Sequence, residues 1–173
     1  MLALADTIDW INGKIGRAAA WLCVAVVAIQ FAVVLLRYLF GIGSIWLQES
    51  ILYSHAAMFL LAAAWTLKSD GHVRVDIFYA SASPRRKAMI DLCGALLLLI
   101  PFAAAILYFS WPYVARSWTI MEGSREASGL PLIFALKTLI PVFAGMLILQ
   151  GAAQAMRAYA FLSGKAHADR AQV

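Results

Sequence analysis

Four stretches of the chain contain no charged side chain, and each is about 20 residues long. They cover residues 18–36, 50–67, 92–115 and 138–156. A helix rises about 1.5 Å per residue, so such a stretch crosses the roughly 30 Å hydrocarbon core of a bilayer. In lipid the backbone must satisfy its own hydrogen bonds, and these apolar runs lack the alternation of barrel strands. We therefore predict an all-α membrane protein with four transmembrane helices in an antiparallel bundle.

The composition supports this interpretation. Hydrophobic residues make up 64% of the 173 residues and charged residues only 13%. Soluble domains average roughly 45–50% apolar and about 25% charged residues. A globule of this size still exposes much of its surface, so its core has no room for this many apolar side chains. A soluble enzyme, a soluble nucleic-acid-binding protein and a disordered protein are all poor fits.

Turn and cap signals separate the predicted spans. The Gly-Ile-Gly-Ser sequence at 41–44 ends the first span with a short turn, so the first two spans form a hairpin. Ser83 is a favoured helix cap and Pro84 suits the first helical position, while Pro101 predicts a kink in the third span. A long outer loop is expected at 112–130. The predicted spans lie at about 16–40, 46–67, 87–111 and 131–156, in one domain of residues 1–160 followed by a polar tail at 161–173.

The segment before the first span predicts a short amphipathic helix on the membrane surface. Apolar side chains recur at helical spacing over residues 4–15, with Trp10 beside them. Asp6 and Asp9 lie where a cleaved signal peptide would carry basic residues, and the apolar run that follows is long enough to span. We therefore expect the N-terminal segment to remain attached.

The distribution of positive charge predicts the orientation. Most of the 14 Lys and Arg residues lie in the N-terminal segment, the connection at 68–87 and the C-terminal tail. Four spans place these three segments on one side, and segments rich in Lys and Arg stay in the cytoplasm. Both termini are therefore expected to be cytoplasmic. The net charge of +5 is explained by topology and anionic lipid, and no nucleic-acid partner is expected.

Ionisable residues inside a span are the natural functional candidates, because burying them is costly. Arg37 and Glu49 flank the first hairpin turn at similar depth, which predicts a structural ion pair or a partner contact. The alternative is that Arg37 reaches the headgroups while Glu49 faces water. His55 is the histidine within a span, and a bis-histidine haem site would need a second one, so we expect a packed histidine hydrogen-bonded to a neighbour.

The remaining reactive side chains predict no enzyme site. Cys23 and Cys93 are near the cytoplasmic ends of their spans and form no CxxC pair, so they are expected to pack as small residues. The polar segment at 72–76 contains His72 and Asp76, but two such ligands make a weak metal site. An interface is the better hypothesis for it. We expect no catalytic residue, no metal and no cofactor.

Several short motifs, taken in order, resemble the small membrane subunit (DctQ-like) of tripartite ATP-independent periplasmic (TRAP) transporters. The resemblance covers residues 6–154. One departure is Gln48, where members often have a second acid beside Glu49. The motifs are Arg-Tyr-Leu-Phe at 37–40, Trp-Leu-Gln-Glu at 46–49, His-Val-Arg-Val-Asp at 72–76, Ser-Gly-Leu-Pro at 128–131, Ile-Pro at 140–141 and Gly145.

This resemblance implies a three-part secondary transporter in the bacterial inner membrane. A periplasmic binding protein captures an organic acid, and a large membrane subunit carries it inward on an ion gradient, usually sodium. The small subunit is a scaffold beside the large one and a docking surface for the binding protein. The residues expected at the large subunit, or bracing the fold, are Arg37, Trp46, Glu49, His72, Arg74 and Asp76. Those expected at the binding protein are Glu122, Arg125 and Glu126.

Three other functions fit the same hydropathy. A stand-alone small transporter working as a homodimer usually needs an acid buried in its first span, where this chain has Gln30. A redox membrane anchor needs more haem or quinone ligands than His55 alone. A purely structural four-helix membrane protein with an unknown partner is the third alternative.

Overall fold

The computed structural model describes residues 1–73 and 79–164, and the described residues fold into helices joined by short connections. Four rods are long and apolar enough to cross a membrane, which confirms the four predicted spans. The third rod, Pro84–Thr119, consists of three consecutive helices. The helices are α1 (Leu2–Phe40), α2 (Ile45–Lys68), α3 (Pro84–Cys93), η1 (Gly94–Leu99), α4 (Ile100–Thr119) and α5 (Ile133–Leu162).

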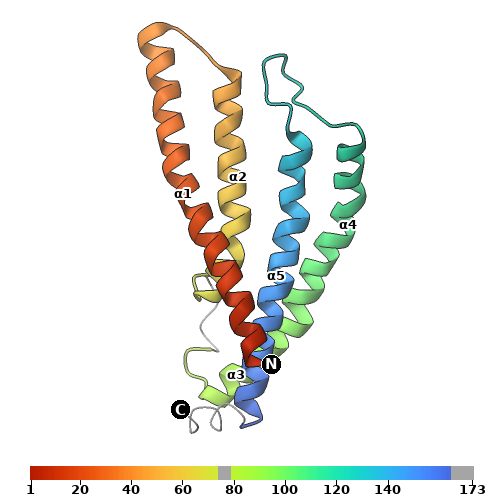
Figure 1. Ribbon diagram of the computed structural model, residues 1–173. Coiled ribbons are helices and arrows are strands. Elements are labelled where there is room, and N and C mark those ends of the chain that lie inside the picture. Colours follow the sequence, from red (N-terminus) through yellow and green to blue (C-terminus); the bar gives the residue numbers. More distant parts are fainter. Residues whose placement is uncertain (74–78, 165–173) are drawn as a thin grey trace.

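The rods form two antiparallel hairpins, α1 with α2 and α4 with α5 (Figure 1). The start of α1 crosses α5 at one end of the bundle, and the two hairpins diverge toward the other end (Figure 1). The connections 41–44 and 120–132 lie together at this diverging end, which we call the loop end. This arrangement is the predicted antiparallel bundle.

Backbone geometry explains the tight turn of the first hairpin. Gly41 adopts the left-handed conformation with φ of 68°, and its N–H donates to the carbonyl of Leu36. Glycine adopts this conformation at little energetic cost because it lacks a Cβ atom. A residue in this conformation ends a helix, because its N–H satisfies one of the last free carbonyls. Ser44 then caps α2 by accepting a hydrogen bond from the N–H of Leu47 at 3.4 Å. The turn predicted at 41–44 is confirmed.

The N-terminal segment is helical, as predicted, but it does not form a separate helix. α1 runs without a break from Leu2 to Phe40, and its first turns pack against α5. The close approach of α1 to α2 depends on Gly16, because a Cβ atom there would lie 2.3 Å from Cβ of Trp65. No proline separates the amphipathic segment from the span, so the two join as one rod despite Gly13 and Gly16.

The third rod extends beyond its predicted end. The helix continues through Pro112 to Thr119, so the outer loop is 120–132 rather than 112–130. Proline is tolerated in membrane helices because neighbouring groups satisfy the freed backbone carbonyl. A π-helical segment, Gly94–Leu99, ends two residues before Pro101, and the kink predicted at Pro101 stays a prediction. A wider turn relieves the clash between the proline ring and the preceding turn.

Small side chains form the centre of the bundle. Ala64 of α2 and Ala103 of α4 are 1% and 0% exposed and pack with Met146 and Leu147 of α5. In lipid, helices associate through close packing rather than exclusion of water, and small residues let the backbones approach. One alanine of each run at 62–64 and 103–105 therefore packs this chain's own helices together.

Candidate functional site

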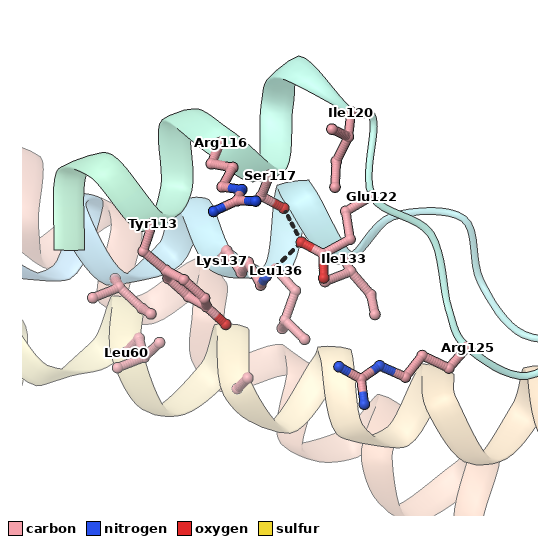
Figure 2. Close-up of a pocket in the computed structure, with 12 residues that line it drawn as sticks. Leu60, Tyr113, Arg116, Ser117, Ile120, Glu122, Arg125, Ile133, Leu136 and Lys137 are labelled. Atoms are coloured by element: carbon pink, nitrogen blue, oxygen red, sulfur yellow. Dashed lines mark hydrogen bonds and ion pairs between the residues drawn. The ribbon is translucent and has the colours of Figure 1, made fainter.

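A pocket of about 750 Å³ opens between α2, α4 and α5 beneath the 120–132 loop (Figure 2). It lies at the loop end, where the two hairpins diverge (Figure 1). Its walls toward the bundle centre are apolar, with Leu60, Leu136 and Ile140 among them. Its polar lining residues are Tyr113, Arg116, Ser117, Glu122, Arg125 and Lys137.

Glu122 is the central acceptor of this pocket. Ser117, which is 1% exposed, donates its hydroxyl to Oε2 of Glu122 at 2.6 Å, and Lys137 forms an ion pair with the same oxygen. The hydrogen bonds from Lys137 and Ser117 lower the pKa of the Glu122 carboxyl from its usual value. The Lys137 ammonium also lies 4.0 Å from the ring centroid of Tyr113. The last turn of α4 and the first turns of α5 are thereby joined.

Two arginines complete the pocket. Arg116 projects from α4 and Arg125 from the loop, and Figure 2 shows both guanidinium groups at the pocket. Both residues are exposed, and within residues 1–73 and 79–164 neither forms an ion pair with a carboxylate. The pocket therefore carries more positive than negative charge.

Glu49 holds the loop from the opposite hairpin. Its carboxylate accepts a hydrogen bond from the hydroxyl of Ser124 and a second one, at 2.5 Å, from the backbone N–H of Leu130. Gly129 makes this contact possible, since a Cβ atom there would lie 2.2 Å from Oγ of Ser124. Arg37 is exposed and forms no ion pair with Glu49, so the structural pair is not formed, while the contact with a partner stays a prediction. Glu49 binds the distant loop because the start of α2 lies beside that loop.

A second polar cluster joins the start of α1 to α5. The Asp9 carboxylate accepts hydrogen bonds from Gln150 at 2.8 Å and from Arg157 at 2.7 Å, and Asn12 donates to Gln150 at 2.8 Å. Gln150 is 0% and Asn12 1% exposed. The Lys68 ammonium at the end of α2 donates to the backbone carbonyl of Asp9 at 3.2 Å. This terminal polar cluster fixes three helices at the end of the bundle opposite the pocket.

The other predicted site residues are scattered. Trp46 is 53% exposed at the start of α2, and Glu126 is exposed on the loop. His72 is exposed after α2, whereas Arg74 and Asp76 lie outside the described residues. The structure therefore brings Glu122 and Arg125 to one pocket and Glu49 to the same loop. Among the described residues, Arg37, Trp46 and His72 do not line this pocket, and Glu126 lies on the loop without lining it.

His55 does not pack as expected. It is exposed on α2, and its ring stacks on Phe59 with centroids 6.4 Å apart. Cys23 and Cys93 are also exposed, contrary to the expectation that they are packed. Among residues 1–73 and 79–164, no group of three His, Cys, Asp or Glu side chains could hold a metal ion.

Sequence reasoning missed the principal partners in both polar clusters. Gln150 and Asn12 could have been singled out from the sequence, because each is a strongly polar residue near or inside an apolar stretch and such a residue needs a hydrogen-bond partner. Lys137 carried a similar signal, since it directly precedes the fourth uncharged stretch. Which residues they bind depends on helix crossings that no local pattern encodes.

Comparison with known proteins identifies the family. The model of the DctQ component of tripartite ATP-independent periplasmic transporters matches residues 18–161. The C4-dicarboxylate TRAP transporter small permease protein DctQ of Vibrio cholerae serotype O1 is 30% identical over 99 residues. That match covers 54% of this chain and 42% of the length of that relative. Since the family model covers most of the chain, the protein belongs to the DctQ component family of TRAP transporters.

Proposed function

We propose that this chain is a scaffold and docking subunit in a TRAP transporter of the bacterial inner membrane. It holds the large membrane subunit and helps to dock a periplasmic binding protein. The complete transporter takes up an organic acid such as a carboxylate, driven by an ion gradient, with sodium as the expected ion. Family membership supports this proposal, and the relative's name includes C4-dicarboxylate transport. The role is in transport and assembly rather than catalysis.

The exposure of His55 is the observation that carries the scaffold role. It lies close to the midpoint of the 24-residue helix α2 and faces outward from this chain. An imidazole facing hydrocarbon at that depth is costly, whereas a neighbouring protein helix can pair with it. Leu52 and Phe59, which are 58% and 67% exposed, lie three and four residues away on the same face. We call Leu52, His55 and Phe59 the α2 stripe, and we propose that the large subunit covers it.

Site-directed cross-linking tests this contact. In a Cys23→Ala/Cys93→Ala background, His55→Cys in native membranes should form a cross-linked product with a large multispan protein. Leu98→Cys is the matched control, because Leu98 is 72% exposed on a different rod. We expect products from position 55 and none from position 98. A homodimer through position 55, or no product, would overturn the scaffold proposal.

Docking of the binding protein is proposed for the 120–132 loop. Glu122 is bound inside the pocket, so the outward-facing Glu126 is the residue best placed to meet a soluble partner. Oppositely charged rim residues accelerate and orient protein association. Glu126→Lys should slow substrate uptake while leaving co-purification with the large subunit intact, and Ala127→Gln serves as a control at the neighbouring exposed position. Normal uptake by Glu126→Lys at low salt would contradict docking at this residue.

A further inference from the structure

We propose that the pocket beneath the 120–132 loop binds the headgroup of an anionic phospholipid from the leaflet at the loop end. Nothing in the scaffold or docking roles requires this site, and this chain alone forms it. Three observations carry the inference: the charge of the pocket, its division into polar and apolar parts, and its opening between membrane helices.

The charge favours an anion. Lys137 and Glu122 neutralise one another as an ion pair, and Ser117 donates its hydroxyl to the same carboxylate. Among the described residues Arg116 and Arg125 form no ion pair with a carboxylate, although Arg125 contributes to lowering the pKa of Glu122. The planar guanidinium group presents paired N–H donors that match the oxygens of a phosphate. The pocket thus offers two guanidinium groups to a phosphodiester.

The rest of the pocket favours a lipid over a free anion. Below the arginines its walls are the aliphatic side chains of Leu60 on α2 and of Ile133, Leu136 and Ile140 on α5. A phosphate ion gains nothing from such walls, whereas an acyl chain buries apolar surface along them. A volume of about 750 Å³ is within the range of small-molecule sites.

The position in the bundle agrees with a lipid. The arginines belong to the last turn of α4 and to the loop, where a transmembrane helix meets the headgroups. The aliphatic walls belong to α2 and α5, which point from there toward the bundle centre (Figure 1). A phospholipid in the bilayer likewise has its phosphate at the headgroup level and its acyl chains toward the membrane centre. The lining residues come from α2, α4, α5 and the loop, so the pocket lies between membrane helices.

Native mass spectrometry of the full chain, purified in mild detergent together with any bound partner, tests the proposal. Phosphatidylglycerol is the probe and phosphatidylcholine the zwitterionic comparison. We expect the wild type to retain phosphatidylglycerol and Arg116→Gln/Arg125→Gln to bind it at least about tenfold more weakly, since charge-assisted hydrogen bonds are lost. Arg85→Gln/Arg86→Gln, which removes two exposed arginines at the other end of the bundle, should bind as the wild type does.

Two further measurements keep the result interpretable. Arg116→Lys/Arg125→Lys preserves the charge but not the planar guanidinium group, so this variant should retain lipid at an intermediate level. Thermal unfolding should show that each variant is folded. Equal loss in the Arg85/Arg86 variant would reduce the effect to overall charge and overturn the site. Equally tight retention of phosphatidylcholine, or displacement of the lipid by millimolar inorganic phosphate, would also overturn it. Cross-linking at position 55 is independent of all these outcomes.

Discussion

At the scale of single residues, positions without a side chain decide how closely the helices approach. Gly16 lies against Trp65, where a Cβ atom would come within 2.3 Å of the tryptophan Cβ. Gly145 is also inside a helix, yet a Cβ atom there would meet nothing within 4 Å. Both glycines lie inside helices, but only Gly145 has space for a methyl group.

We predict that Gly16→Ala destabilises the protein by about 1–3 kcal/mol, because α1 must move away from α2 to relieve the overlap. Gly145→Ala should be neutral or slightly stabilising, since alanine favours a helix over glycine by up to about 1 kcal/mol. Thermal unfolding of both variants in the same detergent measures the difference. Equal unfolding temperatures would show that the α1–α2 crossing tolerates a side chain at position 16.

Glu122 predicts a dependence of stability on pH. Its hydrogen bonds with Lys137 and Ser117 lower the folded-state pKa below the unfolded value. The resulting stabilisation is present above the unfolded pKa and is lost as the pH falls through the folded pKa. We expect the wild-type unfolding temperature to decline more steeply below about pH 4 than that of Glu122→Gln. Parallel pH profiles for the two proteins would contradict this assignment.

At the scale of the elements, each end of the bundle has its own polar cluster. At the loop end, Glu49 of α2 binds the loop, and Lys137 of α5 binds Glu122. At the opposite end, Asp9 of α1 binds Gln150 and Arg157 of α5. Polar contacts of this kind select one helix register, because an unpaired buried polar group is costly. The apolar packing between them is less selective.

We predict that Asp9→Asn loosens the start of α1 from α5. Asp9 is 9% exposed, so loss of its charged hydrogen bonds should destabilise the contact by about 1–3 kcal/mol. Asp6→Asn is the matched control, because the Asp6 side chain is 71% exposed and its ion pair with Arg157 should contribute at most about 1 kcal/mol. Hydrogen exchange over the first turns of α1 measures the loosening. Faster exchange in Asp6→Asn than in Asp9→Asn would reverse our ranking.

At the scale of the whole molecule, the two hairpins are in contact at the end where α1 crosses α5 and diverge at the loop end (Figure 1). This shape leaves the α2 stripe and the pocket accessible, while Ala64 and Ala103 pack at the bundle centre and the terminal polar cluster joins the helices at the opposite end. A scaffold needs joined helices and an accessible surface, and both are present among the described residues.

The orientation of the molecule is a prediction of its own. Because most Lys and Arg residues lie in the N-terminal segment, the connection at 68–87 and the C-terminal tail, we expect the loop end to face the periplasm. In a Cys23→Ala/Cys93→Ala background, an impermeant thiol reagent added to intact cells should label Ser128→Cys in the loop. Ser163→Cys, after the end of α5, should be labelled only after the membrane is opened. The reverse pattern would invert the topology and place the pocket in the cytoplasmic leaflet.

The sequence by itself determined the four membrane helices, the turn at 41–44 and the helix start at Pro84, because hydropathy and turn chemistry are local properties of the chain. Motifs read in order also predicted the family. The partners of Glu49, Asp9 and Glu122 were decided only by tertiary structure. Each contact joins residues from different helices or from a helix and a loop, and its geometry depends on how those elements cross or fold back. The exposure of His55 was hidden for the same reason, since helical periodicity places a residue on a face but does not say which helix covers it.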